Sequence, residues 1–220
     1  MLAANLISYT IPPLVGKDSG EKALNWMNDF HVRHLPVLKD GRLLGILSED
    51  EVLNFMEPEL SIEENKPELI FKSLTPERHL FDVMKLIVDS NLTVVPVVDS
   101  QNKYLGLITL ENIVKHFAET VAITQPGGII VIEMNPRDYS LAEIARLIES
   151  ENTKILSCFL SSPYGEERIE LTLKLSRQDL KHVIATLSRF GYEVKSSFYE
   201  SEYLEDLKSR YDGLMRYLNP

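Results

Sequence analysis

Ser48 with Glu51 and Thr109 with Asn112 each put a hydroxyl residue three positions before an acidic or amide residue, at the predicted start of a helix. A helix N-terminus presents unpaired backbone N–H groups and the positive end of the helix dipole, which favour an anion. Ser48 and Glu51 also fit a capping box, which would satisfy two such N–H groups without a ligand. A ligand site and a helix cap both stay open as interpretations.

Residue types that serve in enzymes are present but scattered. The sequence has neither a Gly-x-Ser-x-Gly elbow nor a Gly-rich phosphate loop, and Cys158 lies in a predicted apolar strand, where cysteine is usually an apolar filler. His31 and His34 lack a third partner for a zinc site, which needs three or four ligands. The remaining histidines are His79, His116 and His182. We therefore predict that the protein is not an enzyme and requires no metal or cofactor.

The segment around the first of these pairs is repeated later in the chain. Residues 34–38 (HLPVL) return sixty positions later as residues 94–98 (VVPVV). Each copy leads through a polar turn to an apolar run with one glycine, at 43–47 (LLGIL) and 104–108 (YLGLI). This internal duplication predicts two copies of one small unit, which we expect to close as a pair.

Each copy is predicted to run helix, strand, turn, strand, helix, with short β-branched strands and apolar helix faces. Asp18 and Glu21 would cap the first helix, and Thr75 would cap its counterpart, with Pro76 at the first helical position. Between the copies, residues 57–68 are acidic with two prolines, which suits a solvated linker.

The pattern changes after residues 124–128, and we place a domain boundary there. The predicted order is strand, helix, strand, strand, helix, strand, which is the split βαβ arrangement. The segments are 128–134, a helix from 140, 155–160, 168–175, a helix from 176 to about 191, and 192–198, with a turn at 162–165. Ser140 with Glu143 and Ser176 with Asp179 would cap the two helices.

The last twenty residues form a third kind of element. Apolar residues recur there at intervals of three and four, at Leu204, Leu207, Tyr211, Leu214 and Leu218. This spacing is typical of a short coiled-coil seam and equally of a helix that packs on its own domain.

Composition bounds the class of protein. The 220 residues carry 33 acidic and 23 basic side chains, a net charge of −10, and one cysteine. An acidic chain without a basic stripe is a poor candidate for binding nucleic acid. The single cysteine, the absence of a long apolar run and the absence of a basic leader favour a cytoplasmic protein without a membrane segment.

The duplicated apolar-Pro-Val and Leu-Gly-apolar patterns resemble a tandem pair of cystathionine-β-synthase (CBS) domains, and the third segment resembles an ACT domain. The whole resembles acetoin-utilisation regulatory-type proteins of bacteria. This implies an α/β (α+β) fold with a tandem CBS domain pair in residues 1–124, with repeats at about 9–56 and 71–121. A ferredoxin-like ACT domain in 127–199 and a C-terminal helix in 200–220 would follow.

The resemblance also implies a ligand site. Paired CBS domains form clefts for adenosyl ligands such as AMP, ADP, ATP or S-adenosylmethionine, with a Ser/Thr-x-x-Asp motif on ribose and phosphate. Here the aspartate is replaced by Glu51 and Asn112. The resemblance implies these ligand-binding residues: Arg33, His34, Leu35, Pro36, Ser48, Glu51, Val94, Val95, Pro96, Thr109 and Asn112. Arg33 and His34 suit a phosphate, so the cleft that contains Arg33 is the expected one.

In the ACT-like segment, Tyr139 stands where the family usually has a glycine that lets the backbone approach an amino acid. We therefore expect this domain to mediate pairing or transmission of state. The predicted function is a regulatory sensor of an adenosyl ligand, a homodimer that relays the signal to an unidentified protein. The alternative is a non-catalytic dimerising scaffold with vestigial clefts.

Overall fold

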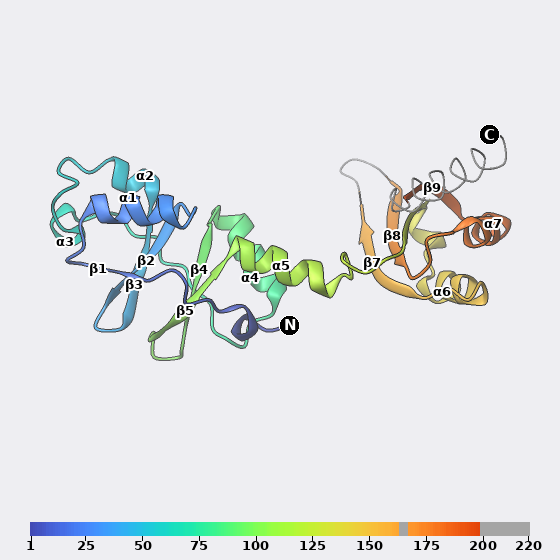
Figure 1. Ribbon diagram of the computed structural model, residues 1–220, viewed down its shortest axis with the longest axis horizontal. Helices are drawn as coiled ribbons and strands as arrows, with labels where there is room; N and C mark the ends of the chain where they lie inside the picture. Colours follow the sequence, from blue (N-terminus) through green and yellow to red (C-terminus); the bar gives the residue numbers. More distant parts are fainter. Residues whose placement is uncertain (163–166, 199–220) are drawn as a thin grey trace, which may run out of the picture. The chain divides into compact units, whose positions relative to one another are not determined.

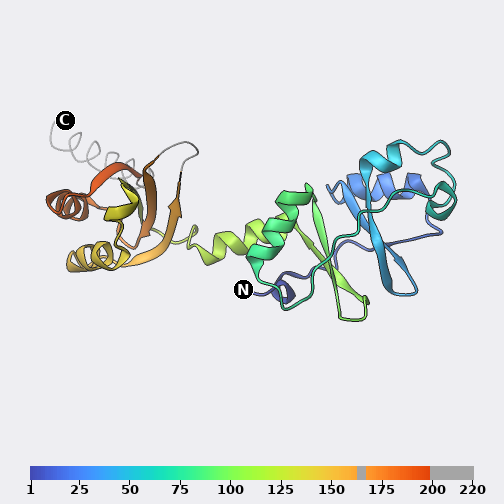
Figure 2. The same cartoon turned by 180° about the vertical axis from the view of Figure 1, so that it is seen from behind.

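The computed structural model describes residues 1–162 and 167–198 (Figures 1 and 2). The chain divides into two compact units, Met1–Phe117 and the part from Ala118 onward. No helix within the described residues is long and apolar enough to cross a membrane. The predicted turn at 162–165 and the apolar repeat of the tail fall wholly or largely outside the described residues.

The first repeat follows the predicted order. Its elements are a short 3-10 turn Ala3–Leu6, β1 Leu14–Val15, α1 Gly20–Asp29, β2 His34–Lys39, β3 Arg42–Ser48, α2 Glu49–Leu53 and α3 Ile62–Asn65. The strands form a sheet in the order β1-β2-β3, in which β1 is parallel to β2 and β2 is antiparallel to β3.

The second repeat has the same plan. It consists of α4 Leu80–Ser90, β4 Val94–Val98, β5 Tyr104–Thr109 and α5 Leu110–Thr120, with β4 antiparallel to β5. A parallel bridge joins Leu74 to Val97, sixty residues after the pairing of Leu14 with Val37. The predicted duplication is therefore confirmed down to the register of the strands.

The two repeats exchange segments. The residues before the first repeat pair with the second, where the Ser8 amide donates to the Leu107 carbonyl at 2.7 Å. The residues before the second repeat pair with the first, where the Ile46 amide donates to the Ile70 carbonyl at 3.0 Å. The core is exchanged in the same way, because Ile46 packs in the second repeat's cluster and Leu107 in the first's.

This exchange explains the glycine in each apolar run. A Cβ on Gly45 would lie 2.7 Å from the Cβ of Leu69, and one on Gly106 would overlap the side chain of Ile7. Only a residue without a side chain lets the exchanged segment approach so closely.

Several predicted helix starts were wrong. Ser19, not Asp18, caps α1, because the Asp18 carboxylate instead accepts from the Val15 amide at 2.9 Å. The side chain of His79, not Thr75, caps α4. The expected linker 57–68 contains α3, whose start is held by a full capping box of Ser61 and Glu64. Only the first case is a competition between adjacent cap residues, Asp18 and Ser19.

The carboxy-terminal unit confirms the split βαβ prediction. Its described elements are β6 Gly128–Met134, a 3-10 turn Pro136–Asp138, α6 Leu141–Ser150, β7 Ile155–Ser161, β8 Ile169–Leu175, α7 Lys181–Arg189 and β9 Glu193–Phe198. The four-stranded antiparallel sheet has the order β7-β8-β6-β9, consistent with an ACT-like domain. Ser140 caps α6 as predicted, whereas α7 begins at Lys181 and not at Ser176.

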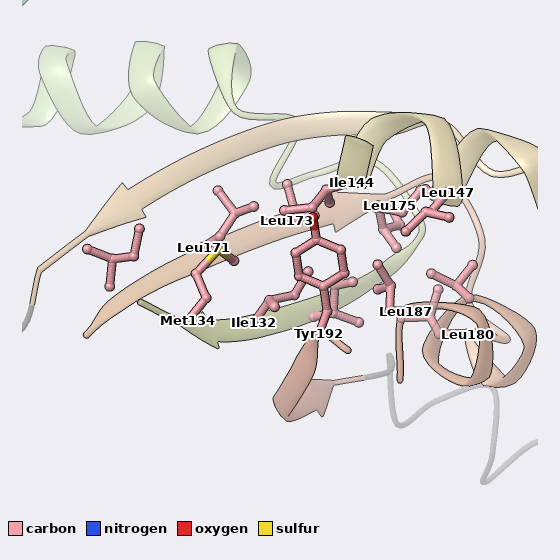
Figure 3. Close-up of a cluster of buried hydrophobic side chains, with 14 residues drawn as sticks. Ile132, Met134, Ile144, Leu147, Leu171, Leu173, Leu175, Leu180, Leu187 and Tyr192 are labelled. Carbon is pink, nitrogen blue, oxygen red and sulfur yellow. The ribbon is translucent and has the colours of Figure 1, made fainter. Parts of the chain in front are cut away.

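The core of this unit lies between one face of the sheet and the two helices α6 and α7 (Figures 1 and 3). Alternate residues of β6 and β8 are buried, which is the pattern of strands with one covered face. Figure 3 shows Ile132, Leu171 and Leu173 of the sheet together with Ile144 of α6 and Leu187 of α7.

Candidate functional site

A cavity of about 450 Å³ lies inside the amino-terminal unit, beside the start of α5. This volume falls within the range of roughly 300–1,000 Å³ that is usual for small-molecule sites. The cavity is lined by Thr10, Ile11, Asp29, Phe30, His31, Val32, Thr93, Thr109, Leu110, Glu111 and Asn112. Residues of both repeats and of the exchanged amino-terminal segment therefore share one site.

The start of α5 is ordered by its own side chains. The Asn112 amide donates to Thr109 Oγ1 at 3.1 Å, and the Thr109 hydroxyl donates to Asn112 Oδ1. The Leu110 amide donates to the carbonyl of Thr93 at 3.3 Å. Two of the N–H groups at this helix start are therefore already satisfied within the chain, which weakens the attraction for an anion.

The walls of the cavity combine apolar and hydroxyl groups. Ile11 and Val32 are buried, with 5% and 7% of their surface exposed, and Thr109 is 8% exposed. Thr10 and Thr93 add hydroxyl groups. Such a site suits a flat heterocycle with polar edges, because apolar walls hold the ring and a few polar groups orient it.

The charges at the cavity are mainly negative. Asp29 and Glu111 contribute carboxylates, both on exposed residues, and His31 contributes an imidazole. Of the lining residues in the described part of the chain, none is lysine or arginine. The cavity therefore offers a cation a better environment than it offers a phosphate.

The start of α2 in the first repeat has a different arrangement. The Glu51 amide donates to Ser48 Oγ at 3.2 Å, which is a helix cap, while Glu51 Oε1 accepts from the Glu68 amide at 2.8 Å. Arg33 Nε lies 3.2 Å from a Glu49 carboxylate oxygen, and its Nη2 lies 3.3 Å from Asp50. Contacts within the chain thus occupy the side chains of Arg33 and Glu51.

His34 points toward the second repeat. Its Nδ1 accepts from the Thr93 amide at 3.2 Å and lies 3.1 Å from Thr93 Oγ1, which in turn accepts from the Arg33 amide at 3.0 Å. His34 is only 9% exposed. Burial, aided by the charge of Arg33, lowers the pKa of His34 below its ordinary value of 6.5, so the ring is neutral near pH 7.

The cavity brings together only part of the predicted set of site residues. Thr109 and Asn112 line it, whereas Arg33, His34, Ser48 and Glu51 do not. The predicted strand residues Leu35, Pro36, Val94, Val95 and Pro96 are buried in β2 and β4 and do not line it either.

Sequence reasoning missed several lining residues, among them Thr10, Asp29 and Glu111. Glu111 could have been found, because it lies inside the predicted motif between Thr109 and Asn112. Thr10 carries no local signal, because it reaches the cavity only through the exchange of segments between the repeats.

A second cavity, of about 570 Å³, lies in the carboxy-terminal unit beside the loop between β6 and α6. Tyr139 lines it, as do Arg137, Glu143 and Tyr192. The Tyr192 hydroxyl donates to Glu143 Oε2 at 3.1 Å. Burial and this hydrogen bond raise the pKa of Tyr192. That this domain does not take a free amino acid in the usual place stays a prediction.

Within residues 1–162 and 167–198, no group of three or more His, Cys, Asp or Glu side chains could hold a metal ion. Cys158 lies in β7, partly buried against the core, and burial raises the pKa of its thiol. A raised pKa keeps a thiol protonated, which disfavours it as a nucleophile.

A family model described as the CBS domain matches residues 16–58 and 67–119. Three solved structures are similar to the chain. A CBS domain pair/ACT domain protein from Thermotoga maritima is 18% identical, covers 54% of this chain and 98% of its own, and has a TM-score of 0.48. A protein described as an acetoin utilization protein from Vibrio cholerae is 19% identical, with 56% and 95% covered and a TM-score of 0.49.

The third is the CBS domain pair of a protein in complex with 5′-methylthioadenosine and S-adenosylmethionine. It is 23% identical, with 54% of this chain and 97% of that chain covered and a TM-score of 0.45. Because all three identities and TM-scores are low, none of these structures bears on which ligand this chain binds. The ligand has to be argued from the residues of the cavity.

Proposed function

Because residues 16–119 form a tandem pair of CBS domains, we propose that the protein is a regulatory sensor that binds an adenosyl metabolite in the cavity at the start of α5. The observation that carries the proposal is the meeting of Thr109 and Asn112 with buried apolar walls in one cavity of suitable volume.

Each part of an adenosyl group has a counterpart in this cavity. The purine would pack between Ile11 and Val32, which supply buried apolar surface. The ribose diol would bind Asn112, which has amide N–H groups to donate while its Oδ1 is engaged by Thr109. The hydroxyl of Thr10, which lies 2.8 Å from the Ser8 hydroxyl oxygen, would add one polar group beside the exocyclic groups of the purine.

The charge of the cavity selects among adenosyl ligands. AMP, ADP and ATP bring a multiply charged phosphate toward Asp29 and Glu111, whereas S-adenosylmethionine brings a sulfonium cation. Each exposed carboxylate contributes on the order of 1 kcal/mol. We therefore expect S-adenosylmethionine, or the neutral 5′-methylthioadenosine, to bind at least about tenfold more tightly than ATP.

In the first repeat, the contacts at the start of α2 favour the alternative function, a scaffold with a vestigial cleft. Arg33 is held by Glu49 and Asp50, and Glu51 is held by the Glu68 amide, so a ligand at α2 would first have to break these contacts. We accordingly propose one ligand per chain. The α2 side would serve as scaffold.

Signalling follows if the ligand favours one arrangement of the two repeats. A ligand shifts such an equilibrium only by its difference in affinity for the two arrangements. Because the cavity is lined by both repeats, a ligand there can have such a difference. Relay to a partner protein and assembly into a homodimer belong to this proposal.

Isothermal titration of metabolite-stripped protein tests the proposal. S-adenosylmethionine, 5′-methylthioadenosine, AMP, ADP and ATP are each titrated up to millimolar concentration. We expect one site per chain, with the sulfonium ligand or the thionucleoside preferred. Thr109→Val should abolish binding, whereas Ser61→Ala, which removes the cap of α3 away from the cavity, should not. No heat from any of the five ligands would refute the proposed function.

A further inference from the structure

The contact between His34 and Thr93 links the two repeats at the wall of the cavity. Thr93 lines the cavity, and its amide donates to His34 Nδ1 at 3.2 Å. Its hydroxyl oxygen accepts from the Arg33 amide at 3.0 Å. Its carbonyl accepts from the Leu110 amide, the first residue of α5. Thr93 therefore joins the first repeat to the helix start at which the ligand would bind.

We propose that His34 is a positioning residue for the cavity, which in its neutral form holds Thr93 in place and in its protonated form releases it and lowers ligand affinity. The inference rests on the proposed function and adds to it a regulation by pH. Neutral imidazole offers Nδ1 as an acceptor, whereas the imidazolium carries a hydrogen there. A protonated His34 would turn an N–H toward the N–H of Thr93, and the hydrogen bond from the Thr93 amide would be lost. The new N–H can donate only to Thr93 Oγ1, 3.1 Å away, which already accepts from the Arg33 amide, so the Thr93 backbone loses its acceptor.

The surroundings of His34 set the pH range. Arg33, directly before β2, opposes protonation, and on α2 Glu49 and Asp50 favour it. Burial is the largest influence, so the pKa lies below 6.5. Neutral His34 therefore predominates at pH 7, and Thr93 is released only as the pH falls through the lowered pKa of His34.

The duplication supplies a matched control. His31 also lines the cavity and is the second imidazole near Thr93. It adopts a left-handed backbone conformation, φ 53°, and its counterpart sixty residues later is Asn91, φ 49°. His31→Asn is therefore expected to fold. His34→Asn keeps an acceptor near the position of Nδ1 and removes the titration, whereas His34→Leu removes both.

The first experiment uses the full-length chain without ligand. The Thr93 amide is followed in ¹⁵N–¹H correlation spectra from about pH 7.5 to 5. In the unsubstituted protein and in His31→Asn, this amide should shift with a midpoint below 6.5. In His34→Asn it should stay constant. A Thr93 amide that ignores pH in the unsubstituted protein would overturn the linkage, whatever the ligand.

The second experiment measures the affinity for S-adenosylmethionine at about pH 7.5 and at a pH below the midpoint found for the Thr93 amide. Loss of one hydrogen bond predicts a roughly two- to tenfold weaker affinity at the lower pH in the unsubstituted protein and in His31→Asn. The affinity of His34→Asn for S-adenosylmethionine should not depend on pH, and His34→Leu should bind weakly at both pH values. A pH dependence that survives in His34→Asn would contradict the inference. Absence of binding throughout would instead overturn the proposed function.

Discussion

Replacing Gly106 by alanine tests the exchange of segments that builds the cavity. Gly106 has a φ of 142°, in a region that residues with side chains rarely adopt. An added Cβ would overlap Ile7 Cγ2 and would lie 3.3 Å from the carbonyl oxygen of Ser8. Ser8 cannot retreat without loss of its hydrogen bonds to Leu107, at 2.7 and 3.3 Å. The substitution therefore carries both backbone strain and overpacking.

The two contributions can be separated within the same protein. Backbone strain costs roughly 1–3 kcal/mol, and overpacking of a tight contact costs a further 1–3 kcal/mol or so. Gly41 also has a positive φ, 75°, but nothing lies within 4 Å of its added Cβ. Gly41→Ala thus reports strain alone, and we expect Gly106→Ala to lower the free energy of unfolding by about 1–3 kcal/mol more.

Urea unfolding followed by tryptophan fluorescence measures this difference. Trp26 in α1 is the only tryptophan of the chain, so the signal comes from the amino-terminal unit. Ile7→Ala in the Gly106→Ala background should restore part of the loss, because the two side chains compete for one space. If Gly41→Ala and Gly106→Ala lowered the free energy of unfolding by the same amount, the close approach of Ile7 and Ser8 to Gly106 would be refuted.

Three further predictions concern single contacts. Asn112→Asp should tighten S-adenosylmethionine binding about tenfold in titration calorimetry, since a carboxylate accepts charge-assisted hydrogen bonds from the ribose; weaker binding would contradict this placement of the ribose. Glu51→Ala should lower the free energy of unfolding by at most about 1 kcal/mol by removing the hydrogen bond to the exposed Glu68 amide, without a change in ligand affinity. Lys195→Met should raise the pKa of Glu133, which the hydrogen bond from Lys195 chiefly lowers, as seen in carboxyl ¹³C shifts. The lowered pKa of Glu133 stabilises the fold above the ordinary pKa of 4.5, and this stability is lost as the pH falls. Lys195→Met removes part of this contribution, so the variant should lose less stability in acid than the unsubstituted protein.

The duplication and the order of elements could be predicted from the sequence, because both depend on patterns that recur along the chain. The offset of sixty residues holds in the structure, where Leu14 pairs with Val37 and Leu74 pairs with Val97. The helix starts were less predictable. Ser19 and Asp18 are adjacent cap residues of similar strength, and only the position of Val15 decides between them.

The lining of the cavity at the start of α5 was predicted only in part, for a physical reason, and the set of binding residues stays a prediction. Thr109 and Asn112 belong to a local motif, and a local motif can be read from the sequence. The pairing of Arg33 could not be read from the sequence in this way. Its guanidinium is paired with Glu49 and Asp50, which any phosphate would have to displace. Patterns in a sequence reveal which groups are suited to a ligand, but not which groups the fold has already paired.

The most direct test of the central claim is the response of backbone amides to S-adenosylmethionine in ¹⁵N–¹H spectra of the full chain. The account predicts shifts at Thr10, Thr93 and Asn112 that saturate at one equivalent, while the amides of Ser48 and Glu51 stay in place. Saturating shifts at Ser48 and Glu51 instead, or no shift at any of the five, would contradict it.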